Sequence, residues 1–126
     1  MVEAHLKEKY ITEIKVGTHT FIADIKPQIG GTDLAPDPHE LLESALAACT
    51  IITVQLYANR KGWPLTSTHV KVVIDKEGKE SHILREISFK GELSPEQKTQ
   101  LLFIADKCPI HKILMSKMEI STVAVE

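Results

Sequence analysis

The architecture expected of the chain follows from one stretch, DPHELLESALAACTIITVQLYANRKG, at residues 37–62. Asp37 is a typical N-cap, a proline occupies the first helical position, and a glutamate stands three residues after the cap, which is a capping-box start. Gly62 at the other end is typical of a helix stop. The stretch therefore predicts a helix over residues 38–61 that is about 36 Å long.

The middle turns of this helix are apolar nearly all round. A helix of that kind is buried on most sides, and a sheet on one side alone would leave Ala48 and Ile51 in water. We therefore expect a second apolar partner, either another helix or the same helix of a second subunit. The apolar residues concerned are Leu41, Leu42, Ala45, Leu46, Ala47, Ala48, Cys49, Ile51, Ile52, Val54, Leu56 and Tyr57.

The rest of the chain mixes strands and helices without βαβ repeats. In order, the sequence predicts a hairpin over residues 9–25, a loop over 26–37, the long helix over 38–61, strands over 68–74 and 82–92, a second helix over about 94–107, a short helical piece over 110–114 and a final strand over 118–125. This order favours an α+β fold. The length of 126 residues fits one domain over residues 1–126.

Composition narrows the function classes. The chain is 43% hydrophobic and 25% charged, which is typical of a globular protein and excludes a disordered chain. A net charge of −2 argues against a nucleic-acid partner. No unbroken apolar run reaches about 18 residues and the first ten residues lack a signal-peptide stretch, so we expect a cytoplasmic protein with no membrane partner.

Two cysteines are the candidate reactive groups. A reducing compartment makes a structural disulfide improbable, so each is either a small buried hydrophobe or a working thiol. Cys49 lies in the middle of the long helix and suits either reading. Cys108 precedes Pro109, and the N–H groups of the short helix that follows are expected to lower its pKa, unless it merely packs. His111 stands in the same turn.

Other chemistries lack sequence support. The chain has no CxxC, HxH or HExxH pattern, so no metal site is expected. It has no glycine-rich phosphate loop and no GxSxG elbow. We therefore expect no cofactor.

Two motifs carry a resemblance to a known family. The run from Pro36 through Glu40 to Thr50 and the run Cys108-Pro109-Ile110-His111-Lys112 each contain one cysteine. Together with the element order, they resemble the osmotically inducible protein C (OsmC) and organic hydroperoxide resistance family. The resemblance implies antiparallel sheets packed on two long helices, and an intertwined homodimer that would cover the apolar helix.

The resemblance also implies a thiol peroxidase. Cys49 would attack a small organic hydroperoxide and become a sulfenic acid, and Cys108 would resolve it to a disulfide. An external dithiol reductant would restore both thiols, and no metal or flavin is needed.

A buried thiol needs a cation to become a thiolate. In the better-studied branch of the family an N-terminal Arg, paired with a Glu ten residues before the helix Cys, supplies it. Here that position is His39, with Glu40 one place later, and no Arg precedes Arg60. The candidate supporting residues are therefore His39, Glu40 and His111.

The missing Arg leaves two alternatives open. One is a weakly active or non-catalytic dimer of the same fold that senses redox state or binds an apolar ligand. The other is a structural dimer with two inert cysteines.

Overall fold

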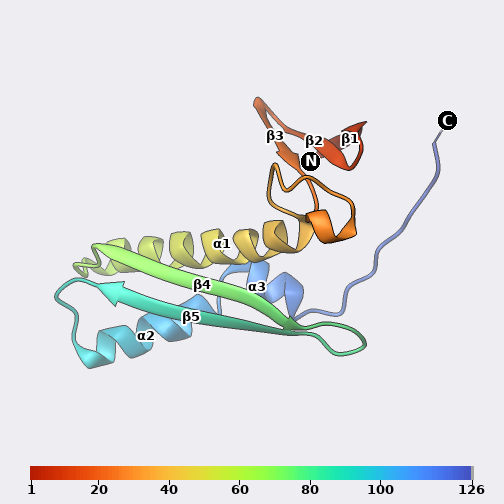
Figure 1. Ribbon diagram of the computed structural model, residues 1–126. Helices are drawn as coiled ribbons and strands as arrows, with labels where there is room; N and C mark the ends of the chain where they lie inside the picture. The colour runs from red at the N-terminus through yellow and green to blue at the C-terminus, as the bar shows by residue number, and fades with distance from the viewer. Residues whose placement is uncertain (126) are drawn as a thin grey trace. The chain divides into compact units, whose positions relative to one another are not determined.

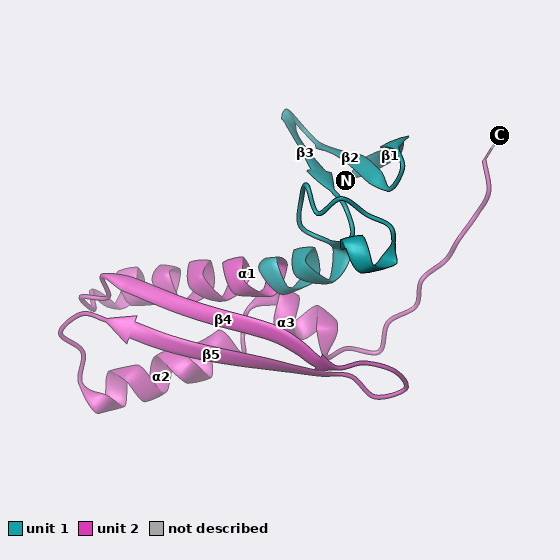
Figure 2. Ribbon diagram, in the orientation of Figure 1, with its two compact units in different colours: residues 1–44 teal, residues 45–126 magenta. Residues whose placement is uncertain are grey.

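The computed structural model describes residues 1–125, and the chain divides into two compact units (Figure 2). The first unit comprises residues 1–44, and the second unit begins at Ala45. Strands and helices follow one another in the order ββ-β-α-ββ-α-α (Figure 1). The α+β class with antiparallel sheets is confirmed. The prediction of one domain over residues 1–126 stays a prediction.

The first unit contains a three-stranded antiparallel sheet. Its strands are β1 (Glu3–Glu8), β2 (Ile11–Val16) and β3 (His19–Ala23), in the order β1-β2-β3. The hairpin predicted over residues 9–25 is confirmed as β2 and β3, and Gly17 in its turn has a φ of 57° that favours glycine. The sequence reading missed β1, whose residues carry no clear alternation of apolar and polar side chains.

The long helix α1 (Pro38–Lys61) has the predicted bounds. Its start is a capping box: the Asp37 N–H donates to Glu40 Oε1 at 3.0 Å, and the Glu40 N–H donates to Asp37 Oδ1 at 2.9 Å. Gly62 follows its last residue with a φ of 69°, the left-handed conformation that ends many helices. A short 3₁₀ turn, η1 (Pro27–Ile29), lies in the loop before the helix.

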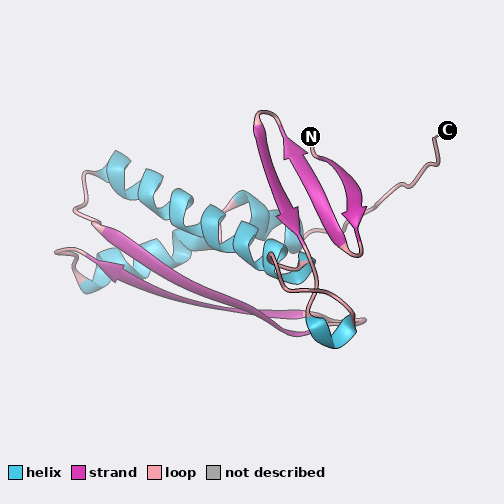
Figure 3. Cartoon of the chain, turned by 45° about the horizontal axis from the view of Figure 1, so that its top comes forward, coloured by secondary structure: helices cyan, strands magenta, loops and turns pink. Residues whose placement is uncertain are grey.

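The second unit packs helices on a two-stranded hairpin (Figure 3). The hairpin is β4 (Ser67–Lys76) and β5 (His82–Lys90), and the helices after it are α2 (Pro95–Ala105) and α3 (Pro109–Leu114). A second capping box, Ser94 with Gln97, starts α2 as predicted. The core joins α1, α2 and the inward face of β5 through Val54, Ala58, Leu65, Leu101, Ala105, Ile87 and Phe89.

One side of α1 is buried and the opposite side is exposed and apolar. The buried residues recur every four positions: Leu46, Thr50, Val54 and Ala58. About half a turn away, Ile52 and Leu56 are 59% and 56% exposed. By length and composition alone, with a mean hydropathy of 1.5, α1 is able to cross a membrane, although the core helix of a globular fold meets the same criteria.

The predicted final strand over residues 118–125 is wrong. Up to Val125 this segment has no strand conformation, and Met118, Ile120 and Val123 are exposed. Its alternating pattern suits a strand, but a strand needs a neighbour to accept its hydrogen bonds, and no described strand lies in register with it. The second helix also ends slightly earlier than predicted, at Ala105.

Candidate active site

The two cysteines come together in the second unit. Cys49 projects from the middle of α1, and Cys108 is the N-cap residue of α3. Each thiol acts on the pKa of the other, and both are free rather than joined in a disulfide. Cys49 is half-buried, whereas Cys108 is fully buried. The two cysteines of the chain are 59 positions apart in the sequence, and the fold brings their thiols close together.

Backbone N–H groups of α3 point at both sulfur atoms. The His111 N–H donates to Cys108 Sγ at 3.3 Å, and the Ile110 N–H donates to Cys49 as well as to Cys108. Pro109 occupies the first helical position, where the missing N–H costs nothing. The prediction that these N–H groups are directed at Cys108 is confirmed. That they also reach Cys49 was not predicted.

The two thiols titrate in opposite directions from the ordinary value. Burial raises the pKa of Cys108, and the adjacent Cys49 raises it further, against the N–H groups of His111 and Ile110. Burial also opposes ionisation of Cys49, but the Ile110 N–H, the Cys108 thiol, the Thr53 hydroxyl and the charge of Arg85 lower its pKa. The expected lowering of the Cys108 pKa is therefore wrong, because complete burial outweighs the N–H groups.

Arg85 is the cation that the sequence reading missed. It projects from the inward face of β5, and its side chain is only 11% exposed. Its guanidinium donates to Thr50 Oγ1 at 3.0 Å and to Asp106 Oδ1 at 2.7 Å. Strand alternation contains the signal, since Arg85 takes an inward position between Ile83 and Ile87. An arginine at such a position needs buried partners.

His111 joins the site through Arg85. The guanidinium lies 3.1 Å from His111 Nδ1, within hydrogen-bond distance. The same residue donates its backbone N–H to Cys108. Among the described contacts, His111 therefore touches Cys108 rather than the Cys49 sulfur.

The other two candidate supporting residues belong to the first unit. Glu40 caps α1 and accepts from Lys26 Nζ at 3.0 Å, while the same ammonium contacts Asp33 at 2.9 Å. The Asp37 N–H and then Lys26 lower the pKa of Glu40. His39 is exposed in the first turn of α1. A role for either residue beside Cys49 stays a prediction.

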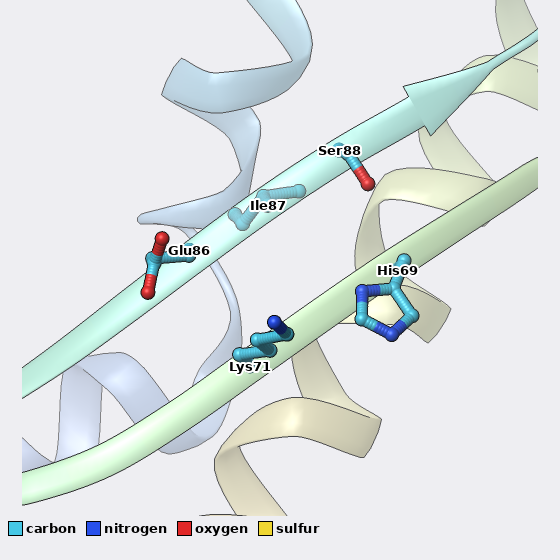
Figure 4. Close-up of a pocket in the computed structure, with 5 residues that line it drawn as sticks. All are labelled: His69, Lys71, Glu86, Ile87 and Ser88. Atoms are coloured by element: carbon cyan, nitrogen blue, oxygen red, sulfur yellow. The ribbon is translucent and has the colours of Figure 1, made fainter.

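A hollow of about 270 Å³ lies on the outward face of the β4–β5 hairpin (Figure 4). It is lined by His69, Lys71, Glu86, Ile87 and Ser88. Glu86 and Ser88 alternate with the inward Arg85, so this hollow faces away from the thiols. Among residues 1–125, no group of three or more His, Cys, Asp or Glu side chains is arranged to hold a metal ion.

Comparison with known proteins places the chain in a family. The model of the OsmC-like protein family matches residues 31–123. A search of curated proteins finds no significant match.

Solved structures share the fold at low sequence identity. An osmotic stress induced and detoxification response protein of Psychrobacter arcticus has a TM-score of 0.78 at 19% identity, over 89% of this chain and 85% of the other. An OsmC-like protein of Mycoplasma pneumoniae has a TM-score of 0.74 at 20% identity, over 90% and 85%. An organic hydroperoxide resistance protein of Bacillus subtilis has a TM-score of 0.65 at 19% identity, over 91% and 89%. With three-quarters of its sequence matched by the family model and its fold shared with these structures, the chain belongs to the OsmC-like protein family.

Proposed function

We propose that the protein is a cysteine-based peroxidase that reduces small organic hydroperoxides, with Cys49 as the attacking thiol and Cys108 as the resolving thiol. The observation that carries the proposal is the contact between two thiols whose pKa values move in opposite directions. A peroxidase needs an accessible thiolate and a protonated partner held beside it. In support, Cys49 is the less buried thiol and has the lowered pKa, whereas Cys108 is fully buried and has the raised pKa.

In the first step the Cys49 thiolate attacks one oxygen of the hydroperoxide. The sulfur–oxygen bond forms as the oxygen–oxygen bond breaks, which gives a Cys49 sulfenic acid and an alkoxide. The alkoxide takes a proton and leaves as the alcohol. The Cys108 thiol is a nearby proton source, and its loss of the proton prepares it for the next step.

In the second step the Cys108 thiolate attacks the sulfur of the Cys49 sulfenic acid. A disulfide forms, the sulfur–oxygen bond breaks, and the oxygen leaves as water after taking a proton. An external dithiol then reduces this disulfide by exchange and is itself oxidised to a disulfide. The balance over one cycle is one hydroperoxide and one dithiol converted to one alcohol, one water and one oxidised dithiol.

The apolar surroundings of Cys49 favour an organic hydroperoxide over hydrogen peroxide. Ala45, one turn before Cys49 on the same side of the helix, is apolar and half-buried. Burying an alkyl or aryl group against such a surface contributes about 25 cal/mol for each Å² removed from water. A relative of the same fold is named as an organic hydroperoxide resistance protein, which agrees with this choice.

Mass spectrometry after one equivalent of cumene hydroperoxide tests the proposal. The expected product is a Cys49–Cys108 disulfide, and dithiothreitol should sustain turnover. Cys49→Ser should abolish both, whereas the control Ser88→Ala, on the outward face, should change neither. If no disulfide or sulfenic acid forms, the peroxidase proposal is wrong. A disulfide that forms once without turnover would instead indicate a redox sensor.

We further propose that the protein acts as a homodimer through the exposed apolar side of α1. Ile52 and Leu56 lie opposite the buried side of the helix, where a second copy would cover them. Light scattering should give twice the mass of the 14.0 kDa chain. Ile52→Glu should yield monomers, and the outward control Lys71→Glu should not. A wild-type monomer at micromolar concentration would refute the dimer.

The cytoplasmic location is also proposed, since both thiols are free and the mechanism needs a cellular dithiol. Cell fractionation should place the protein with soluble markers. Recovery in a membrane fraction that resists salt and carbonate washes would contradict this.

A further inference from the structure

Arg85 connects every segment that carries the thiol pair. Its first terminal nitrogen donates to Thr50 Oγ1 at 3.0 Å and lies 3.5 Å from the Ala105 carbonyl oxygen. Its second donates to Asp106 Oδ1 at 2.7 Å and to His111 Nδ1 at 3.1 Å. These acceptors come from α1, the end of α2 and α3. One guanidinium therefore links three helices at one point.

The acceptors adjoin the cysteines in the chain. Thr50 follows Cys49, Asp106 precedes Cys108 by two residues, and His111 donates its N–H to Cys108 Sγ. Thr50 is fully buried, so its hydroxyl fixes the guanidinium away from water. Displacement of Arg85 would therefore disturb both sides of the thiol contact.

The charged and titratable groups that face Arg85 are few. Among the described contacts they are the Asp106 carboxylate, the His111 ring and the Cys49 thiol. Asp106 is 62% exposed, so water screens its negative charge more than it screens the buried guanidinium. The charge of Arg85 adds to the groups that lower the pKa of Cys49, after the Ile110 N–H, the Cys108 thiol and the Thr53 hydroxyl.

Arginine suits this place better than lysine. A planar guanidinium offers five N–H donors in a fixed fork, which suits several acceptors that come from different segments. A lysine ammonium is a compact charge on a flexible stem and is more strongly hydrated. A lysine at position 85 would keep the positive charge but would not hold Thr50, Asp106 and His111 in the same arrangement.

We propose that Arg85 is the positioning residue of the thiol pair, a role that rests on the proposed peroxidase function. It holds Thr50, the end of α2 and His111 on one guanidinium, and it supplies the positive charge that stabilises the Cys49 thiolate, while Asp106 moderates that charge. This places the activating cation on β5 of the second unit, although no Arg precedes Arg60 in the sequence.

The test measures the pH dependence of iodoacetamide alkylation, with Cys49 followed by peptide mass spectrometry. Arg85→Met should raise the pKa of Cys49 and slow its alkylation at pH 7 by about threefold to tenfold, since one pKa unit is tenfold in thiolate. Asp106→Asn should act in the opposite direction and speed alkylation by about twofold to threefold, because it removes a screened negative charge. The control Arg60→Met, exposed in the last turn of α1, should leave the rate unchanged.

Opposite shifts separate charge from damage to the fold. If the substitutions only loosened the fold, Arg85→Met and Asp106→Asn would change the alkylation rate of Cys49 in the same direction. Arg85→Lys keeps the positive charge, so it should restore the pKa of Cys49 while disulfide formation stays slow. If Arg85→Met leaves the alkylation profile unchanged, or if Asp106→Asn shifts it in the same direction, the proposal is wrong. Alkylation uses no hydroperoxide, so a protein that lacks peroxidase activity still tests the role of Arg85.

Discussion

Replacing Thr50 with valine removes one hydroxyl from the most constrained position beside the thiols. This hydroxyl donates to the Leu46 carbonyl at 2.7 Å and accepts from Arg85 at 3.0 Å, and the residue is fully buried. Valine has nearly the same shape, so packing changes little. Removing the hydrogen bond to the charged Arg85 costs about 1.5–3 kcal/mol of folding stability, and removing the neutral hydrogen bond to the Leu46 carbonyl costs about 0.5–1.5 kcal/mol.

We therefore expect Thr50→Val to lower the free energy of unfolding by about 2–4.5 kcal/mol. Urea denaturation at matched protein concentration measures this value. Thr50→Ser keeps the hydroxyl and should lose only about 1 kcal/mol for the missing methyl group. Thr99→Val, which removes an exposed hydroxyl bonded to the Pro95 carbonyl in α2, is the matched control and should stay within about 0.5 kcal/mol of the wild type.

Two results would refute the reasoning about Thr50. If Thr50→Val costs no more than Thr99→Val, the hydrogen bond to Arg85 contributes nothing to stability. If Thr50→Ser costs as much as Thr50→Val, packing of the methyl group and not the hydroxyl is responsible.

Three further predictions concern other parts of the chain. Cys108→Ser should trap a Cys49 sulfenic acid that dimedone labels after hydroperoxide treatment, and absence of the label would contradict the division of roles. The Thr32 hydroxyl is the main group that lowers the pKa of Asp24 from 3.8 to about 2. The Asp24 carboxylate therefore stabilises the folded loop fully above about pH 4, and this stabilisation is lost as the pH falls toward 2. The protection factor of the Leu34 N–H, which is the exchange rate divided into the intrinsic rate at the same pH, should therefore fall over that range, and an unchanged protection factor would contradict this. Thr68→Val should raise the melting temperature, because the Thr68 hydroxyl is buried without a partner among the described residues, and a lower value would contradict it.

Local sequence signals predicted the helices well. Both capping boxes, at Asp37 and at Ser94, act through contacts within four residues, so the sequence alone contains the interaction that starts each helix. The strand over residues 118–125 failed for the opposite reason. A strand is stabilised by a neighbour, and no alternation of side chains reveals whether a neighbour is present.

The thiol pair shows the same distinction between local and tertiary signals. The motif around Cys108 predicted the N–H groups of α3, because that contact spans only three residues. The pKa direction was not predictable, since it depends on the complete burial of Cys108 and on Cys49, which is remote in sequence. The expectation that burial gives Cys49 a raised pKa is wrong, because the N–H, thiol, hydroxyl and Arg85 charge around Cys49 outweigh burial and lower its pKa.

The pKa values of the two thiols differ because their three-dimensional surroundings differ, and not because of their neighbours in the sequence. The Ile110 N–H favours ionisation of both thiols, but it is the foremost of the groups that lower the pKa of Cys49 and the last of those that act on Cys108. Cys49 is less buried and also interacts with the Thr53 hydroxyl and the charge of Arg85, whereas Cys108 faces the negative charge that forms on Cys49. Once Cys49 ionises, Cys108 is stabilised as the protonated donor to it. Oxidation of Cys49 to a neutral sulfenic acid removes that negative charge, which should lower the pKa of Cys108 at the moment when its thiolate is required. The order of the two steps would then be imposed by the charge on Cys49, and a Cys108 pKa that is the same in the wild type and in Cys49→Ser would refute this coupling.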